Sequence, residues 1–458
     1  MTRSTPSSPT AAPQSTATAG ASFASLPLPP HMQANLQQLG YLSMTPIQAA
    51  SLPLTLAGKD LIAQAKTGSG KVKALVLCPT RELADQVTQE IRRLARAEDN
   101  IKTLTLCGGV PVRNQLASLS HGAHIIVGTP GRILDHLQRE TLDLSALNTL
   151  VLDEADRMLD MGFAEDIAQV IACAPKARQT LLFSATYPDG VSSMAARFMR
   201  EPQEVRLKEV HAATKIRQRF YEVTEAERLH AVGLLLNHFR PASTLAFCNT
   251  KQQCRDLVAV LEAQGISALE LHGDLDQRDR DQVLVQFANR SCSVLVATDV
   301  AARGLDIAQL EAVINVDITP DAEVHTHRVG RTGRADGEGW AFSLASLDEM
   351  GPVGRIEHAH GTPFTWYPLA ELTPAGSGTL EAPMVTIQIL GGRKEKIRPG
   401  DVLGALTKDM GFPGAKIGKI NVNEFSTYVA VERDIAAQVL RALNAGKVKG
   451  KSVKARTL

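Results

Sequence analysis

The stretch Thr149-Leu150-Val151-Leu152-Asp153-Glu154-Ala155-Asp156 joins an apolar run to a cluster of acids. Its first four residues have the length and the apolar content of a buried strand. Ligands of an open α/β sheet bind beside the carboxyl ends of its strands, which is where these acids would lie. We therefore expect a parallel sheet with an acidic site at one edge. Asp153 is the expected partner of Mg²⁺, and Glu154 is expected to orient or deprotonate an attacking water.

Upstream of this stretch, Ala65-Lys66-Thr67-Gly68-Ser69-Gly70-Lys71 follows an apolar strand candidate at residues 60–63. The segment matches the first seven positions of a phosphate-binding loop. Its glycines allow backbone N–H groups to surround phosphates, and Lys71 supplies a point charge to the β and γ phosphates. Either motif alone could be a solvated turn. Both motifs, in this order within one sheet, favour a nucleotide site.

Short apolar runs alternate with amphipathic stretches along most of the chain, a pattern typical of parallel α/β sheets. The first set of runs is Ala74–Cys78, Leu104–Leu106, His124–Val127, Thr149–Leu152 and Thr180–Phe183. The second set is Leu245–Cys248, Ala268–Leu271, Val294–Ala297 and Ala312–Val316. We expect two tandem α/β domains, at residues 23–210 and 211–370. A Ser-, Thr-, Ala- and Pro-rich tail at residues 1–22 is expected to be disordered.

A Pro-, Gly-, Ser- and Thr-rich segment at residues 371–381 predicts a linker to a smaller module at residues 382–458. The expected order in the module is strand, helix, two strands, helix and strand. The runs are Val385–Leu390, Asp401–Met410, Lys419–Asn423, Thr427–Val431, Ile435–Asn444 and Ser452–Ala455. This order builds a four-stranded antiparallel sheet backed by two helices, which many RNA-binding modules share and which also serves other functions.

Charge is distributed unevenly along the chain. From Glu381 to Leu458 there are 14 Lys and Arg against 7 Asp and Glu, a net charge of +7. Because the whole chain carries +1, the remainder carries −6. A basic module on an acidic body indicates a polyanionic partner, although a merely solvated basic surface is the alternative.

Composition also bears on the compartment. No apolar run is long enough to cross a bilayer, so we expect no membrane segment. The six cysteines lack the paired spacing of structural zinc sites, which favours reduced thiols in a cytoplasmic protein.

The segment His327-Arg328-Val329-Gly330-Arg331-Thr332-Gly333-Arg334 places three arginines at three-residue spacing among glycines. Such arginines can reach phosphates across a cleft and stabilise the charge that develops on a transferring phosphoryl group. An exposed basic loop is the alternative for this segment taken alone.

Together these motifs make residues 23–350 resemble the DEAD-box RNA helicase family, in which two RecA-like domains use ATP and Mg²⁺. Phe23, Gly40, Tyr41, Thr45, Pro46 and Gln48 resemble the family's Q motif, so Phe23 and Gln48 are expected to recognise adenine. In the family's first domain, the segments that contact the RNA backbone resemble Pro79-Thr80-Arg81-Glu82-Leu83-Ala84, Gly108-Gly109 and Thr129-Pro130-Gly131-Arg132. By the same resemblance Asp156, Ser184 and Thr186 couple the ATP and RNA activities.

The second domain also carries the family's segments in order. Phe247-Cys248-Asn249-Thr250 and the run from Ala297 to Asp306 are similar to its RNA and nucleotide segments. The resemblance implies RNA contacts at Thr250 and Thr298 and an ATP ribose contact at Asp306. It also implies a coupling role for His327 and arginine fingers at Arg331 and Arg334.

The third module resembles the C-terminal RNA-binding domain of the DbpA type of bacterial helicase. That resemblance implies an RRM-like fold, 23S rRNA in pre-50S particles as the target, and a role in ribosome biogenesis. The candidate contact strand Phe425–Val429 has few stacking aromatics, which favours recognition of shape and phosphates by basic side chains. The expected contacts are Lys394, Lys396, Lys447, Lys449 and Lys451. No stable protein partner is implied.

The chain departs from the family directly after the phosphate-binding loop. The family has a threonine that ligates Mg²⁺ and then a helix, whereas this chain has Val72-Lys73 and then the strand expected from Ala74. Valine has no oxygen to ligate a metal. Two residues are also far fewer than the dozen or so that a crossover between parallel strands requires. An internal deletion, an inactive paralogue and a rearranged first domain remain open, and the deletion is favoured because the other motifs are intact.

The function expected from these patterns is ATP-dependent remodelling of local RNA duplexes. The first alternative is a hydrolysis-deficient RNA-binding protein, which Val72 and the missing helix favour. The second alternative is a DNA helicase, which the combination of the Q motif, Asp153–Asp156 and Ser184-Ala185-Thr186 disfavours.

Overall fold

We describe the protein from a computed structural model. The described residues are 21–56, 72–98, 100–184, 189–200, 202–205, 216–302, 310–333, 339–375 and 379–458. The chain divides into two units, Met1–Glu209 and Val210–Leu458, each of which is described by itself. The strand candidate at residues 60–63, the segment 65–71 and most of the N-terminal tail lie outside the described residues.

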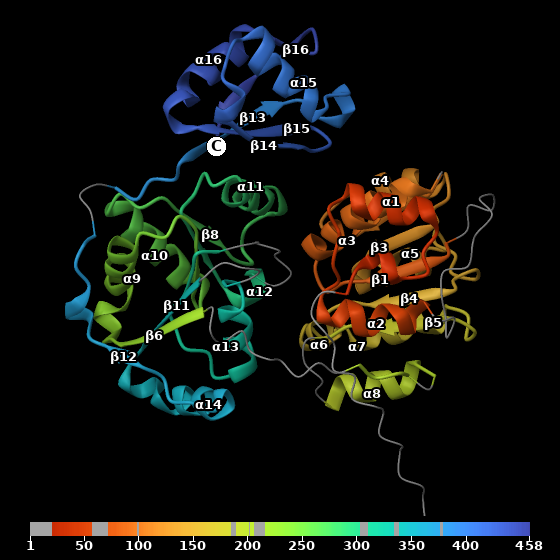
Figure 1. Ribbon diagram of the computed structural model, residues 1–458, viewed down its shortest axis with the longest axis horizontal. Coiled ribbons are helices and arrows are strands. Elements are labelled where there is room, and N and C mark those ends of the chain that lie inside the picture. The colour runs from red at the N-terminus through yellow and green to blue at the C-terminus, as the bar shows by residue number, and fades with distance from the viewer. Residues whose placement is uncertain are drawn as a thin grey trace, which may run out of the picture. The chain divides into compact units, whose positions relative to one another are not determined.

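The first unit contains a parallel sheet in the order β2-β3-β1-β4-β5 (Figure 1). The strands are β1 (Ala74–Leu77), β2 (Thr103–Leu106), β3 (Ile125–Gly128), β4 (Thr149–Leu152) and β5 (Gln179–Leu182). β4 has the bounds expected from the sequence, and the other four overlap their expected runs within one residue at each end. These helices surround the sheet: α1 (Pro30–Gln38), α2 (Pro46–Leu56), α3 (Arg81–Leu94), α4 (Val112–Leu119), α5 (Pro130–Gln138), α6 (Ala155–Asp160), α7 (Ala164–Ala172) and α8 (Asp189–Phe198).

Both faces of this sheet are buried, because side chains alternate between them along each strand. Leu75 and Leu77 of β1 pack in a cluster with residues of α5 and α7. Val76 lies in a second cluster with Ala84 of α3. Burial on both faces explains why the strands read as continuous apolar runs rather than as alternating ones.

The second unit contains a seven-stranded parallel sheet in the order β12-β6-β11-β10-β7-β9-β8. Four strands match expected runs: β7 (Thr244–Phe247), β8 (Ala268–Leu271), β9 (Val294–Ala297) and β10 (Ala312–Asn315). Three were not expected: β6 (Ile216–Glu222), β11 (Gly339–Ala345) and β12 (Trp366–Tyr367). The helices of this domain are α9 (Glu225–Phe239), α10 (Lys251–Ala263), α11 (Gln277–Ala288), α12 (Asp299–Ala302), α13 (Ala322–Val329) and α14 (Met350–His360).

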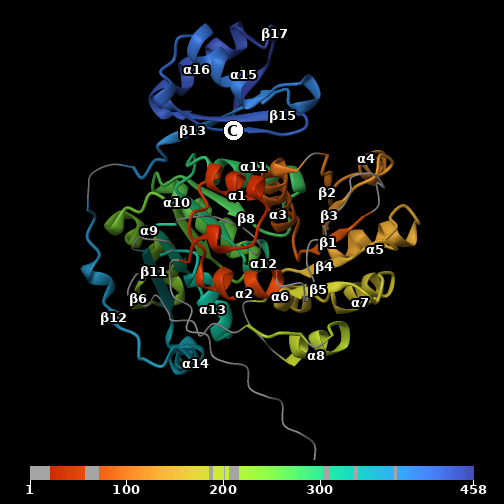
Figure 2. The same ribbon diagram turned by 45° about the vertical axis from the view of Figure 1, so that its right-hand side comes forward.

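The C-terminal module contains an antiparallel sheet in the order β14-β15-β13-β18. The strands are β13 (Met384–Leu390), β14 (Ile417–Val422), β15 (Ser426–Glu432) and β18 (Ala455–Thr457). Helices α15 (Pro399–Gly404) and α16 (Ala436–Ala445) lie on one face of this sheet and share its apolar core (Figure 2). The last expected strand was misplaced, because Lys447–Val448 and Lys451–Ser452 form a separate hairpin, β16–β17, before β18 begins.

The expected linker is anchored to the second parallel sheet at both of its ends. Leu372 and Leu380 belong to the apolar cluster that α9 and α10 form with that sheet. Beyond the linker, the hydroxyl oxygen of Thr386 lies 3.1 Å from Nδ2 of Asn289 and 2.7 Å from Oγ of Ser291. The module is therefore attached through buried apolar and polar contacts as well as through the chain.

Among the helices that the structure describes, none has the length and apolar character that a membrane span requires.

Candidate ATP and RNA sites

The acids after β4 lie on a sharp strand-to-helix turn. The amide of Asp153 donates to the carbonyl of Leu77 in β1, which continues the sheet by one residue. Glu154 then adopts a left-handed conformation with φ 50° and caps the N-terminus of α6. This conformation is uncommon for a residue with a side chain, and such strain clusters at functional sites.

Asp153 is a half-buried carboxylate whose charge lacks a cationic partner among the described residues. Its Oδ1 accepts a hydrogen bond from the amide of Glu154 at 3.1 Å. Burial raises the pKa of Asp153, and this hydrogen bond opposes the increase. A buried acid with no ion pair in the described part of the chain is suited to a cation that arrives with a ligand.

The structure brings Asp156 and Ser184 together. The amide of Asp156 donates to the hydroxyl oxygen of Ser184 at 3.2 Å, and the amide of Ala155 donates to the carbonyl of Phe183. The turns after β4 and β5 are therefore bonded directly, as a coupling role would require. Thr186, also expected in that role, lies outside the described residues.

The expected RNA contacts of the first unit follow the three other strands of the same sheet. Pro79, Thr80 and Arg81 follow β1, Gly109 follows β2, and Thr129 follows β3 and precedes Arg132. Because all five strands are parallel, these residues lie at the same edge as Asp153. The order of strands thus places RNA candidates along β2-β3-β1 and the acids and Ser184 along β4-β5.

A buried glutamine that the sequence did not reveal holds Arg132. Oε1 of Gln115 accepts from NH1 of Arg132 at 2.9 Å, and Nε2 of Gln115 donates to the carbonyl of Cys107 at 2.8 Å. Oε1 also lies 2.8 Å from Nε2 of His136, whose pKa is lowered by burial and then by the charge of Arg132. A single polar residue on an amphipathic helix carries no motif, so no sequence pattern pointed to Gln115.

The two residues expected at the adenine are both half-buried. Phe23 packs against Tyr41 with ring centroids 6.4 Å apart, and Oε1 of Gln48 accepts from the amide of Thr45 at 2.9 Å. Residues 65–71, expected to bind the phosphates, and Asp306, expected at the ribose, lie outside the described residues.

In the second unit, expected site residues also follow the carboxyl ends of strands. Thr250 follows β7 and caps α10, where its hydroxyl oxygen accepts from the amide of Gln253 at 3.1 Å. Thr298 directly follows β9, and its amide donates to the carbonyl of Leu271. His327 lies on α13 and Arg331 lies two residues beyond that helix, whereas Arg334 is outside the described residues.

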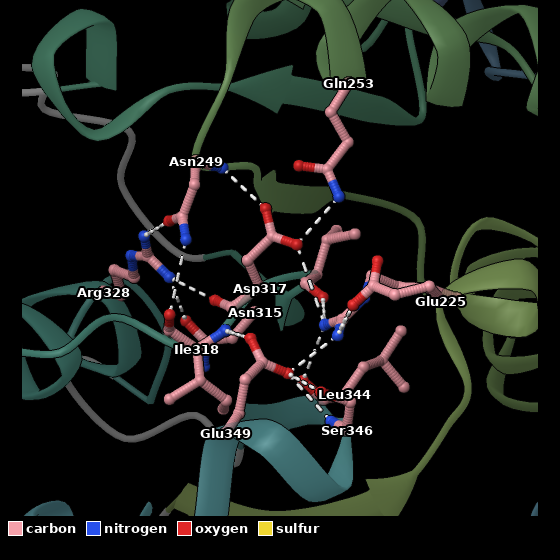
Figure 3. Close-up of polar contacts among 12 residues, drawn as sticks. Glu225, Asn249, Gln253, Asn315, Asp317, Ile318, Arg328, Leu344, Ser346 and Glu349 are labelled. Atoms are coloured by element: carbon pink, nitrogen blue, oxygen red, sulfur yellow. Dashed lines mark hydrogen bonds and ion pairs between the residues drawn. The ribbon is translucent and has the colours of Figure 1, made fainter. Parts of the chain in front are cut away.

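Buried polar and charged side chains connect these segments through hydrogen bonds and ion pairs (Figure 3). The guanidinium of Arg328 pairs with both carboxylate oxygens of Asp299 at 2.7 Å and reaches Oδ1 of Asn249 at 3.1 Å. Asp317 accepts from the amide of Asn249 and from Nε2 of Gln253, each at 2.7 Å. The sequence analysis did not single out Asp317, although an acid directly after an apolar strand is the same signal that marked Asp153.

The expected lysines of the C-terminal module are all exposed, and three of them make contacts within the module. Nζ of Lys449 donates to the carbonyl of Lys396 and lies 3.3 Å from a carboxylate oxygen of Asp401. Lys394 lies 3.2 Å from Glu424, and its Nζ is 4.4 Å from the centre of the Phe425 ring. Lys447 and Lys451 lie on the β16–β17 hairpin that also carries Lys449.

The candidate contact strand is mostly unavailable to RNA. Thr427, Tyr428 and Val429 are buried, whereas Phe425 is 58% exposed. Tyr428 accepts a hydrogen bond from Nε2 of Gln388 at 3.3 Å, so its hydroxyl is engaged within the sheet. Phe425 beside Lys394 is therefore the one aromatic of that strand segment that can stack on a base.

Family models match three successive parts of the chain. Residues 45–194 match the DEAD/DEAH box helicase model, residues 226–336 the helicase conserved C-terminal domain, and residues 386–457 the DbpA RNA binding domain. ATP-dependent RNA helicase DbpA from Escherichia coli (strain K12) is 51% identical over 451 positions, covering 94% of this chain and 98% of the relative. The chain belongs to the DbpA type of DEAD-box RNA helicases.

Other DEAD-box helicases match about three quarters of the chain. DEAD-box ATP-dependent RNA helicase CshA from Geobacillus kaustophilus is 42% identical over 354 positions, covering 73% of this chain and 76% of the relative. The structure of Saccharomyces cerevisiae Dbp5 bound to RNA and ADP BeF3 superposes with a TM-score of 0.68 at 28% identity. The superposition covers 76% of this chain and 96% of the Dbp5 chain. The expected fold and family are thereby confirmed.

Proposed function

We propose that this DEAD-box helicase uses ATP hydrolysis to separate short RNA duplexes. One observation carries the proposal: the first sheet brings the expected RNA contacts and the acids Asp153 and Glu154 to the same edge. The E. coli relative is named an ATP-dependent RNA helicase, and the yeast relative has been solved with RNA and a nucleotide analogue bound. Closure of both domains on one RNA strand and one ATP would bend that strand and locally unpair it.

In this proposal the acids and arginines act on the phosphates of ATP. Asp153 fits an Mg²⁺ site, through a water, because its buried carboxylate has no ion pair in the described residues. Mg²⁺ would supply positive charge that offsets the charge of the phosphates. Glu154 would orient the attacking water, and Arg331 and Arg334 would stabilise the charge on the transferring group.

The C-terminal module would select the RNA. Its match to the DbpA RNA binding domain and its exposed lysines support a structured rRNA target, which we propose to be 23S rRNA in cytoplasmic pre-50S particles. Lysines that contact phosphates give affinity, whereas shape and a few base contacts give selectivity. Duplex separation by the two α/β domains would then be directed to this RNA by the module.

A second candidate function is RNA binding without hydrolysis, and the position of Val72 favours it. Val72 is buried in the core of the first sheet, and the amides of Lys73 and Ala74 donate to the carbonyl of His124. β1 therefore starts two residues after Val72, and no helix separates Lys71 from the sheet. The chain lacks the N-terminal helix dipole and the metal-ligating hydroxyl that normally accompany such a loop.

A deletion would explain this departure, and the alignment with the E. coli relative leaves room for one of suitable length. It spans 451 positions, whereas 94% of 458 residues is about 430 residues. About 20 aligned positions of the relative therefore have no counterpart in this chain. That length suits one helix and its connections.

Phosphate release in the presence of RNA separates the two candidates. Three proteins are compared: the chain as given, a version with a helix and a threonine inserted after Lys71, and Glu154→Gln as the inactive control. Release by the given chain that rises with RNA and is absent in Glu154→Gln supports the first candidate. Release by the helix-restored version alone supports the second.

A further inference from the structure

The polar network in the second sheet joins the segments that carry its expected site residues. Asn249 precedes Thr250, Asp299 follows Thr298, and Arg328 follows His327. Each of the three network residues is thus the sequence neighbour of one expected contact. Figure 3 shows Arg328 beside Asn249, and Asp317 between Asn249 and Gln253.

Asp317 is the point at which these contacts meet. One carboxylate oxygen accepts from the amide of Asn249 and the other from the side chain of Gln253 on α10. The carbonyl of Asp317 accepts from NH1 of Arg328 at 2.7 Å. The side chain of Asp317 therefore fixes the turn after β7, while its backbone fixes the arginine of α13.

Arg228 holds this carboxylate from a helix that contains no family motif. Its NH1 lies 3.7 Å from Oδ1 of Asp317 and donates to the carbonyl of Val316 at 2.8 Å. Its NH2 donates to Glu349 at 2.7 Å and to Glu225 at 2.6 Å. Arg228 is 1% exposed and Asp317 is 7% exposed, so water screens this pair little.

Glu349 fixes the other side of the same junction. Its Oε1 accepts from the amide of Ile318 at 3.2 Å, and its Oε2 accepts from the amide of Ser346 at 2.8 Å. Glu349, held by Arg228, thus connects the residue after Asp317 with the turn after β11. Removing one charge from such a buried set leaves the others uncompensated, so the set acts as a unit.

We propose that Arg228 and Asp317 are positioning residues, which hold the Asn249–Thr250 turn and the His327–Arg328 helix in the geometry that RNA binding requires. Both side chains are buried, so their role is assigned through the segments that they hold. The RNA part of this inference rests on the proposed function, whereas the positioning part does not.

The matched substitutions are Asp317→Asn and Asp274→Asn in the full chain. Asp274 is a surface carboxylate that pairs with Lys251 and Arg255 of α10, the helix that Asp317 also contacts. Both changes remove one negative charge with almost no change in shape. Only the first changes the bonds of the Asp317 side chain to the turn after β7, whose Asn249 also contacts Arg328 of α13.

Hydrogen exchange measured by mass spectrometry reads the positioning directly. We expect Asp317→Asn to speed exchange about tenfold in peptides covering residues 249–253 and 325–331, because the amide of Asn249 loses a charged acceptor and the side chain of Asn249 contacts Arg328. Asp274→Asn should leave both peptides within twofold of the unsubstituted chain. Unchanged exchange in both peptides of Asp317→Asn would overturn the inference.

A second pair of variants tests Arg228 and guards against simple loss of folding. Arg228→Lys keeps the charge and should retain part of the protection, whereas Arg228→Met should lose it. Both variants are checked by the exchange of peptides in β8 and β9, which should remain slow if the sheet is folded. Equal protection in Arg228→Met and the unsubstituted chain would contradict the role of Arg228.

Addition of single-stranded oligo(U) to the same samples tests the functional consequence. RNA should protect residues 249–253 in the unsubstituted chain, and Asp317→Asn should need about tenfold more RNA for half of that protection. No protection in the unsubstituted chain would count against the proposed RNA contact at Thr250. The exchange rates without RNA would still decide the positioning inference.

Discussion

At the scale of single residues, burial without partners sets the protonation of His325. This side chain is 3% exposed between Phe220 and Phe364, and neither ring nitrogen forms a hydrogen bond within the described residues. Burial, followed by the charges of Arg328 and His360, lowers the pKa of His325 to about 4 from 6.5. The folded domain therefore excludes a proton that the unfolded chain accepts.

This difference predicts a pH dependence of stability. The folded pKa lies below the unfolded one, so the contribution of neutral His325 is complete above pH 6.5 and is lost as the pH falls toward 4. His325→Phe should remove about 2 kcal/mol of the loss that occurs between pH 7 and pH 5. Urea unfolding at pH 7 and pH 5 measures it, with the exposed His358→Gln as control. An equally steep loss in His325→Phe would contradict the assignment.

Phe425 is expected to stack on a base of RNA because its side chain is exposed. Its ring is exposed beside Lys394 in the turn before β15, whereas Tyr428 within β15 is buried. Stacking of one base contributes about 1–3 kcal/mol, so Phe425→Ala should weaken binding of a 23S rRNA fragment by about fivefold or more. Fluorescence titration measures the affinity. Leu403→Ala, an exposed apolar position on α15, should change it less than twofold, and equal losses in both variants would refute a stacking role.

At the scale of elements, the β16–β17 hairpin concentrates charge. Lys447, Lys449 and Lys451 lie on it, and Lys449 contacts the loop that holds Lys396. Changing the three lysines to Gln should lower the slope of log affinity against log salt by up to about 2–3, because each phosphate contact contributes about 0.7–0.9. The same change at Lys408, Lys416 and Lys419, outside the hairpin, should leave the slope nearly constant. Equal slopes for the two triple variants would argue against the hairpin as the RNA contact.

Elements with strong apolar patterns were predictable from the sequence, and elements stabilised by other contacts were not. β9 is buried at every position and β4 at two of its four positions, and both were expected with the observed bounds. β6 carries Arg217 and Arg219, whose guanidinium groups lie over the rings of Trp340 and Tyr367. β6 was therefore not recognised from the sequence, because its arginines pack on aromatic rings that lie more than 100 residues away along the chain.

The same limit applies to the candidate sites. Motif residues such as Asp153, Ser184 and Thr250 could be identified because local sequence carries them. Gln115, Arg228 and Glu349 could not, because their roles depend on partners brought together by tertiary structure. Asp317 is an intermediate case. Its position after the strand β10 could be predicted from the sequence, whereas its hydrogen-bond partners could not.

At the scale of the whole molecule, each parallel sheet presents expected contacts at the carboxyl ends of its strands, and a basic module follows. The module is attached to the second sheet by Leu372, Leu380 and Thr386, so the two should respond to RNA as one unit. The buried Val72 marks the place where the chain departs from this otherwise complete plan.

The most direct test of an ATP-driven helicase is strand separation. A short RNA duplex joined to a 23S rRNA fragment is mixed with the full chain, with and without ATP, and with Glu154→Gln as control. The account predicts release of the short strand that requires both ATP and Glu154. Equal release with and without ATP, from a chain that still binds the RNA, would contradict it.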